Sequence, residues 1–145
     1  MEKKRIVTKI LVAIDGSKHA SKALDFALEV AEQCDAEVQI FSVFPPVIIP
    51  SFPVRIPMLL QVEDNFKNIL HNALEKAKEK KPMLKISTKL GKGYPADEIV
   101  KTAKEGSFDL IVVGSRGLGN IEETVLGGVS DRVADKATCP VLIIK

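Results

Sequence analysis

Cysteine is scarce in this chain, and its apolar runs are short. Cys34 and Cys139 fit neither a metal-ligand spacing nor a CxxC redox motif, so we expect them to be core residues of a reduced cytosolic protein. No run approaches the roughly 20 apolar residues that cross a bilayer. The apolar run near the start is too short for a signal peptide and contains Asp15. The sequence therefore predicts a cytoplasmic protein without a membrane partner.

An excess of charge of one sign is also missing. The net charge is +2, and the 21 basic residues are mixed with 19 acidic ones along the chain. This pattern gives no electrostatic basis for a nucleic-acid partner. The densest basic run, KAKEKK at 76–81, is interpreted as the solvated last turn of a helix, where positive charge suits the helix dipole.

What is present is an alternation of β-rich and helical patterns over all 145 residues. The β-rich runs are 10–14, 36–43, 84–91, 109–114 and 140–145. The first and the fourth are almost wholly apolar, as in strands that are buried on both faces, whereas the third alternates and is expected nearer an edge. The pattern predicts one doubly wound α/β domain, residues 1–145, with helices on both faces of a parallel sheet.

Apolar residues at helical spacing predict four helices between these strands. The first follows Ser17, which we expect to be its N-cap. The second begins at Leu59, the third spans 95–105, and the fourth begins at Ile121 or Glu123 and ends at Lys136. Five of the eight prolines lie in the segment 44–57, which is therefore expected to be an irregular loop.

The carboxyl ends of the predicted strands collect the features that point to a ligand. Asp15 follows the first strand, Val43 and the proline-rich segment follow the second, and a glycine cluster follows the fourth. Doubly wound sheets bind ligands at this edge, where the strand order reverses. The residues 112–133 hold five of the nine glycines, so the glycine cluster needs a physical reason.

Two familiar phosphate-binding loops do not fit the glycine cluster. A dinucleotide fingerprint GxGxxG fails because Glu122 stands at its third glycine, and a P-loop fails because Asn120 and Ile121 follow Gly119 in place of Lys and Ser or Thr. The remaining pattern is Gly114-x₂-Gly117-x₉-Gly127-Gly128-Val129-Ser130. Its amides, together with a helix N-terminus, would form an anion-binding nest. The alternative is that the glycines allow a helix to pack closely on the sheet.

Three segments resemble the universal stress protein family: VAIDGS at 12–17, VVGSRGLG at 112–119 and VLGGVSDRVADKATCPVLIIK at 125–145. The resemblance covers nearly the whole chain. It implies a five-stranded sheet of order 3-2-1-4-5, of the adenine nucleotide alpha hydrolase-like type. In the nucleotide-binding branch of that family the glycine motif holds ATP, which we expect with Mg²⁺. The matching residues in this chain are Ala13, Asp15, Val43, Val113, Gly114, Gly117, Gly127, Gly128, Val129 and Ser130.

One position departs from the family pattern. Gly128 stands where Ser or Thr is expected, which removes one hydroxyl donor from the predicted phosphate site. Such a hydrogen bond contributes roughly 0.5–1.5 kcal/mol, or up to ~3 kcal/mol with a charged acceptor. Ser130 either supplies a replacement hydroxyl or caps the last helix. The departure supports the alternative that the protein is a nucleotide-independent interaction module of the same family.

The remaining candidates each have a simpler interpretation. Asp15 either lines the ribose or closes a turn, and Arg116 either approaches the phosphates or is an ordinary exposed arginine. His19 and His71 have no partner at metal-ligand spacing and are expected at the surface or its boundary. No serine lies in a GxSxG elbow or beside an identifiable histidine. We therefore expect a sensor or switch with slow hydrolysis at most, rather than an ATP-cleaving enzyme.

The last predicted strand, 140–145, is apolar and ends the sequence. In the implied strand order it lies at the sheet edge, where an uncovered apolar strand tends to pair with another chain. The family resemblance implies a homodimer joined through this strand, with the two copies related by a two-fold axis.

Overall fold

The computed structural model describes residues 6–45, 56–116 and 128–145. Its five strands are β1 (Lys9–Ala13), β2 (Glu37–Phe44), β3 (Ile86–Lys92), β4 (Leu110–Gly114) and β5 (Val141–Ile144). They form one parallel sheet of order β3-β2-β1-β4-β5. The doubly wound fold and the strand order expected from the sequence are confirmed.

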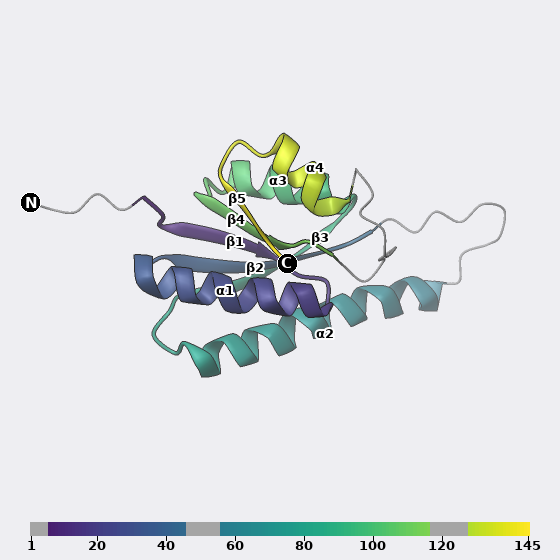
Figure 1. The fold of residues 1–145 in the computed structure, drawn as a ribbon. Coiled ribbons are helices and arrows are strands. Elements are labelled where there is room, and N and C mark those ends of the chain that lie inside the picture. The colour runs from purple at the N-terminus through teal and green to yellow at the C-terminus, as the bar shows by residue number, and fades with distance from the viewer. Residues whose placement is uncertain (1–5, 46–55, 117–127) are drawn as a thin grey trace, which may run out of the picture.

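Four helices cover the two faces of the sheet within the described residues. They are α1 (Lys18–Cys34), α2 (Ile56–Lys80), α3 (Pro95–Glu105) and α4 (Val129–Lys136). Figure 1 shows α1 and α2 on one face and α3 and α4 on the other. Among the described helices, none combines the length and the apolar character that a membrane span requires.

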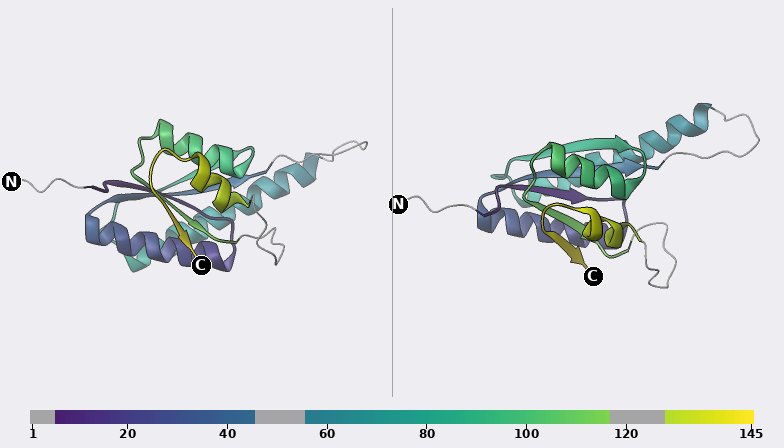
Figure 2. Two further views of the ribbon diagram at one scale, coloured as in Figure 1. Left: turned by 45° about the horizontal axis from the view of Figure 1, so that its top comes forward. Right: turned by 90° about the horizontal axis from the view of Figure 1, so that it is seen from above.

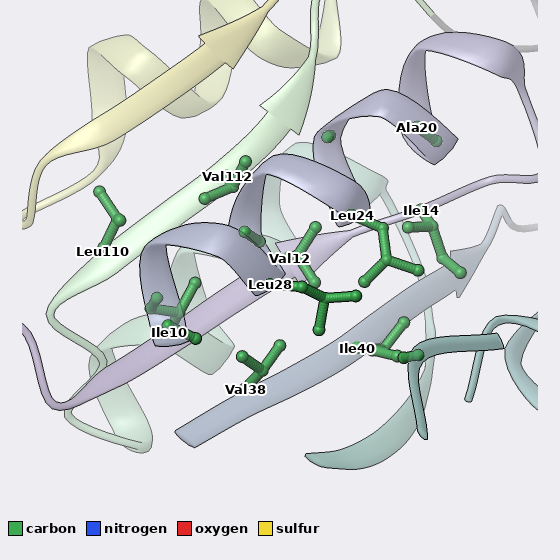
Figure 3. Close-up of a cluster of buried hydrophobic side chains, with 14 of the residues drawn as sticks. Ile10, Val12, Ile14, Ala20, Leu24, Leu28, Val38, Ile40, Leu110 and Val112 are labelled. Carbon is green, nitrogen blue, oxygen red and sulfur yellow. The ribbon is translucent and has the colours of Figure 1, made fainter. Parts of the chain in front are cut away.

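Alternate residues of the central strands contribute to two separate hydrophobic cores, one on each face of the sheet. Ile10, Val12 and Ile14 lie beside α1 in Figure 3 and share a core with residues of α1 and α2, whereas Leu11 packs on the α3 and α4 side. Successive side chains of a strand point to opposite faces, so a strand between two helical layers must be apolar throughout. This is the physical reason for the continuous apolar runs of β1 and β4.

The first turn of α1 forms as its sequence predicts. The Ser17 hydroxyl accepts a hydrogen bond from the Ala20 amide at 3.2 Å, which satisfies one of the unpaired amides of that turn. The residues that α1 buries follow helical spacing: Ala20, Ala23, Leu24, Ala27, Leu28 and Ala31. The small alanines bring the helix close to the sheet.

The start of two helices differs from the prediction. The α2 helix begins at Ile56 rather than Leu59, with Pro57 in its first turn, where a missing amide costs nothing because no partner exists for it. The α4 helix begins at Val129, because the backbone of Gly128 is extended, with φ −61° and ψ 166°. The predicted start positions, Ile121 and Glu123, lie outside the described residues. The sequence-based prediction started this helix before Gly128, because it relied on apolar spacing alone.

The basic run at 76–81 is less solvated than the sequence suggested. The Lys81 ammonium lies 2.9 Å from a Glu32 carboxylate oxygen and 3.1 Å from Glu29, and its side chain is only 17% exposed. Lys80 pairs with Asp25 at 2.7 Å. The end of α2 is thus joined to α1 by ion pairs. The two cysteines are free and partly buried against the two cores, close to what was expected.

At the amino edge of the sheet, one carboxylate joins β1 to β4. Asp109 Oδ2 accepts from the Thr8 hydroxyl at 2.7 Å, the Thr8 amide at 2.9 Å and the Lys9 amide at 3.0 Å. These bonds, the Thr8 hydroxyl first, hold the pKa of Asp109 below its usual value. A lowered folded-state pKa stabilises the fold above the unfolded-state pKa, and this contribution is lost as the pH falls through the folded-state value.

We therefore expect Asp109→Asn to be less stable than the wild type at pH 7, with the difference shrinking as the pH falls below about 4, the pKa of an unfolded Asp. Urea unfolding at pH 7 and at a series of pH values below 4 measures this. The matched control is Glu105→Gln, which neutralises an exposed carboxylate at the end of α3. A stability difference for Asp109→Asn that did not change with pH would contradict the assignment.

Candidate functional site

The strand order reverses between β1 and β4, and this reversal locates the candidate site. The chain leaves β1 for α1 on one face, and α4, the helix that follows β4 in sequence, lies on the other. Figure 2 shows the carboxyl ends of these neighbouring strands at one edge of the sheet. Connections that diverge to opposite faces leave a crevice at this edge, where doubly wound sheets take their ligands.

Three predicted site residues lie together at the carboxyl ends of the central strands. Ala13, Val43 and Val113 belong to β1, β2 and β4, and all three pack in the core that faces α3 and α4. Val43 and Val113 are buried, and Ala13 is partly buried. We call these three residues the apolar floor, although the core covers most of the surface of Val43 and Val113.

The α4 helix contributes to the same core. Val133 is fully buried in the same core, and Ser130, one turn closer to the helix start, is 8% exposed. Residues three apart share a helix face, so Ser130 also faces the sheet. The N-cap is Gly128, so the idea that Ser130 caps this helix is wrong.

No described side chain caps the amides at the start of α4. Gly128 and Val129 are both exposed there. Uncapped amides and the positive end of the helix dipole suit an anion such as a phosphate. Asp131 in the same turn brings a negative charge, which a phosphate with a bound cation tolerates better than a bare one. The described part of the predicted phosphate site therefore fits the group, without the hydroxyl that Gly128 lacks.

Asp15 stands where β1 ends, and its carboxylate closes a turn. Its Oδ1 accepts from the Ser17 amide at 2.9 Å, and Gly16 between them has a φ of +88°. The interpretation of Asp15 as a turn residue is therefore confirmed.

The structure requires glycine at position 114 for a different reason from the predicted anion-binding nest. A Cβ atom built at Gly114 would lie 2.9 Å from the carbonyl carbon and the Cβ of His19 in α1. Among the described glycines, the positive φ values occur at Gly16 and Gly93. Gly114 is therefore needed for the close packing of α1 on β4, the alternative interpretation of the cluster, and not for a left-handed turn.

The other predicted residues lie outside this group or outside the part of the chain that the structure describes. Arg116 is exposed two residues beyond β4, and Gly117 and Gly127 lie outside the described residues. His19 is half-buried, and the His71 side chain is 69% exposed beside Glu75, as expected for boundary and surface positions. Among the described residues, no group of three or more His, Cys, Asp or Glu side chains could hold a metal ion.

One residue at the rim was not singled out from the sequence. Ser42 is 1% exposed in β2, and its hydroxyl donates to the Ile14 carbonyl at 2.7 Å. The signal for it is a single serine within the run IFSVF, since a buried hydroxyl needs a partner.

A groove of about 720 Å³ lies away from this rim. It runs along α1 and is lined by Lys22, Phe26, Ile144 and the ion-paired end of α2. It contains none of the predicted site residues. Its walls combine the apolar side chains of Phe26 and Ile144 with ion-paired charged ones, and no amides of a helix start lie among them, so the rim remains the candidate for a nucleotide.

Comparison with known proteins identifies a family for this chain. The model of the universal stress protein family matches residues 7–145. Universal stress protein YxiE from Bacillus subtilis (strain 168) is 40% identical over 147 residues, which cover 94% of this chain and 98% of that protein.

Two similar solved structures are complexes with an adenine nucleotide. A universal stress protein in complex with cAMP has a TM-score of 0.76 and 29% identity, covering 97% of this chain and 98% of that one. The universal stress protein from Archaeoglobus fulgidus in complex with dAMP has a TM-score of 0.70 and 25% identity, covering 97% and 99%. Fold, family model and sequence identity agree, and this chain belongs to the universal stress protein family.

Proposed function

We propose that this protein binds an adenine nucleotide at the carboxyl edge of β1, β2 and β4 and acts as a nucleotide-dependent regulator in the stress response. The observation that carries the proposal is that the apolar floor and α4, whose first amides no described side chain caps, contribute to one core. Ala13, Val43 and Val113 form the floor, and Gly128 to Ser130 form the helix start. The cAMP and dAMP complexes of related proteins support the same ligand class.

Each part of a nucleotide has a matching chemical environment at this rim. The apolar floor suits the adenine ring, the Asp15 carboxylate suits ribose hydroxyl groups, and the amides at the start of α4 suit phosphates. We expect ATP with Mg²⁺ as the cellular ligand, since the cation offsets the charge of the phosphates near Asp131. The cytoplasmic location is likewise a prediction from the sequence.

Calorimetric titration with Mg·ATP, AMP and cAMP tests this function directly. Saturable binding of at least one of them is expected, and adenine absorbance should be released when freshly purified protein is denatured. Folded protein that binds none of the three at millimolar concentration would contradict the proposal. A turnover above about 1 s⁻¹, in the range of ordinary enzymes, would instead point to an enzyme rather than a switch.

Gly128→Ser is expected to increase nucleotide affinity. The backbone of Gly128, with φ −61° and ψ 166°, accepts any residue, and serine there restores the hydroxyl of the family pattern. One neutral hydrogen bond of roughly 0.5–1.5 kcal/mol corresponds to about a 2- to 13-fold tighter Kd. The control is Gly128→Ala, which fills the same space without a hydroxyl, and equal affinities of the two variants would refute this role.

The alternative function is a nucleotide-independent dimeric interaction module. The difference in polarity between the two edge strands of the sheet supports a dimer. The β5 edge has the sequence VLII with Ile143 37% exposed, whereas the β3 edge carries exposed lysines at 89 and 92. Charged edges resist strand pairing and apolar edges favour it, so we propose a homodimer through β5.

Ile143→Lys is expected to convert the dimer into a monomer, since it places a charge on the pairing edge. Light scattering at tens of micromolar protein measures the mass. Thr88→Lys on the opposite edge strand is the matched control and should leave the mass unchanged. A monomeric wild type would remove the dimer and leave the nucleotide site untouched.

A further inference from the structure

Ser42 is a buried polar residue at the rim. It is 1% exposed and lies between Phe41 and Val43 near the end of β2. A buried hydroxyl costs free energy unless it forms a hydrogen bond. The Ser42 hydroxyl donates to the Ile14 carbonyl at 2.7 Å, which satisfies both groups.

This hydrogen bond lies where the pairing of β1 with β2 ends. Ala13 and Phe41 are the last register pair of the two strands. One residue further, the Ile14 amide donates to the Phe41 carbonyl at 2.9 Å, and the Ile14 carbonyl accepts from Ser42. Both backbone polar groups of Ile14 are therefore held by β2, and the next residue in the chain is Asp15.

A continuous series of hydrogen bonds then leads from Asp15 into α1. The Asp15 carboxylate accepts from the Ser17 amide at 2.9 Å, and the Ser17 hydroxyl accepts from the Ala20 amide at 3.2 Å. Gly16 permits this path with its φ of +88°. The Asp15 carboxylate thus belongs to a turn that is bonded to Ser42 through Ile14 at one end and continues into α1 at the other.

We propose that Ser42 is a positioning residue for nucleotide binding: its hydroxyl fixes the Asp15 turn relative to Val43, the neighbouring residue of β2 in the predicted site. This inference rests on the proposed function. Ser42 acts through Asp15, so its contribution to binding disappears when Asp15 loses its carboxylate.

A double-mutant cycle tests this dependence. Ser42→Ala is expected to weaken nucleotide binding about three- to tenfold, in the range of one lost hydrogen bond, and Ser42→Thr, which keeps the hydroxyl, restores most of it. In the Asp15→Ala background, Ser42→Ala changes the Kd less than twofold. The matched control is Thr102→Val, which removes another buried hydroxyl from α3 and leaves the Kd unchanged.

Amide hydrogen exchange of the nucleotide-free protein separates this inference from the proposed function. Ser42→Ala is expected to speed exchange at the Ser17 amide, whereas Thr102→Val does not. If the wild type binds no adenine nucleotide, the proposed function fails, and exchange at Ser17 alone decides whether Ser42 anchors the turn. Unchanged exchange at Ser17, or a Kd of Ser42→Ala within twofold of the wild type, would overturn the positioning role.

Discussion

Asp15→Ala is expected to weaken adenine nucleotide binding by about 10- to 150-fold, the equivalent of roughly 1.5–3 kcal/mol for hydrogen bonds to a charged group. Asp15 stands at the end of β1, next to the apolar floor of the predicted site. Its loss removes the carboxylate that would accept from ribose hydroxyl groups. The measurement is the Kd by calorimetry, and it is the largest effect that we expect on binding from a single side chain.

Two controls separate binding from folding in this experiment. Asp97→Asn neutralises an exposed carboxylate that pairs with Lys136 at 3.1 Å, and it should leave the Kd unchanged. A nucleotide without ribose hydroxyls should bind the wild type and Asp15→Ala with similar affinity. It cannot donate a hydrogen bond from a ribose hydroxyl to Asp15, so the loss of the carboxylate removes no contact with it. If Asp15→Ala weakened this nucleotide as much as ATP, Asp15 would act only through its turn.

Gly114→Ala is expected to cause the largest loss of stability at the rim. The added methyl group would lie 2.9–3.0 Å from backbone atoms of His19, and backbone cannot swing aside as a flexible side chain can. Overpacking of this kind costs about 1–3 kcal/mol. Each kcal/mol lowers the Tm by about 2–4 °C in a domain of this size.

Thermal unfolding followed by circular dichroism measures this effect. The neighbouring substitution Ser115→Ala is the control, since it changes a side chain just beyond β4 without adding an atom against α1. Its effect should be within about 0.5 kcal/mol. A Tm of Gly114→Ala equal to that of the wild type would show that α1 and β4 adjust to the methyl group at no cost.

These two residues show how local and long-range information divide in this chain. The position of Asp15 at a strand end follows from the apolar run before it, and Ser17 as N-cap follows from the helical pattern after it. The role of Gly114 does not follow from its neighbours in sequence. A glycine that opens a turn and a glycine that admits a helix have the same sequence signature.

Helix boundaries show the same division. The third helix was predicted from apolar spacing at its observed bounds, Pro95–Glu105, and in the structure a proline opens it and a glycine caps its end. The last helix was predicted too long, because apolar spacing continues before Gly128 while the backbone there is extended. Lys81 was taken as solvated, since the partners that bind it lie about fifty residues away in α1.

The sequence by itself determined the alternation of strands and helices, the burial of the central strands and the end of the sheet at which the candidate residues gather. These follow from local periodicity, which each segment carries in its own residues. Only the tertiary structure decided that α1 packs on Gly114, that the Ser42 hydroxyl binds the Ile14 carbonyl, and that Ala13, Val43 and Val113 share one core. Such contacts join segments far apart in the chain, and the geometry of packing, rather than the pattern of any one segment, selects which atoms meet.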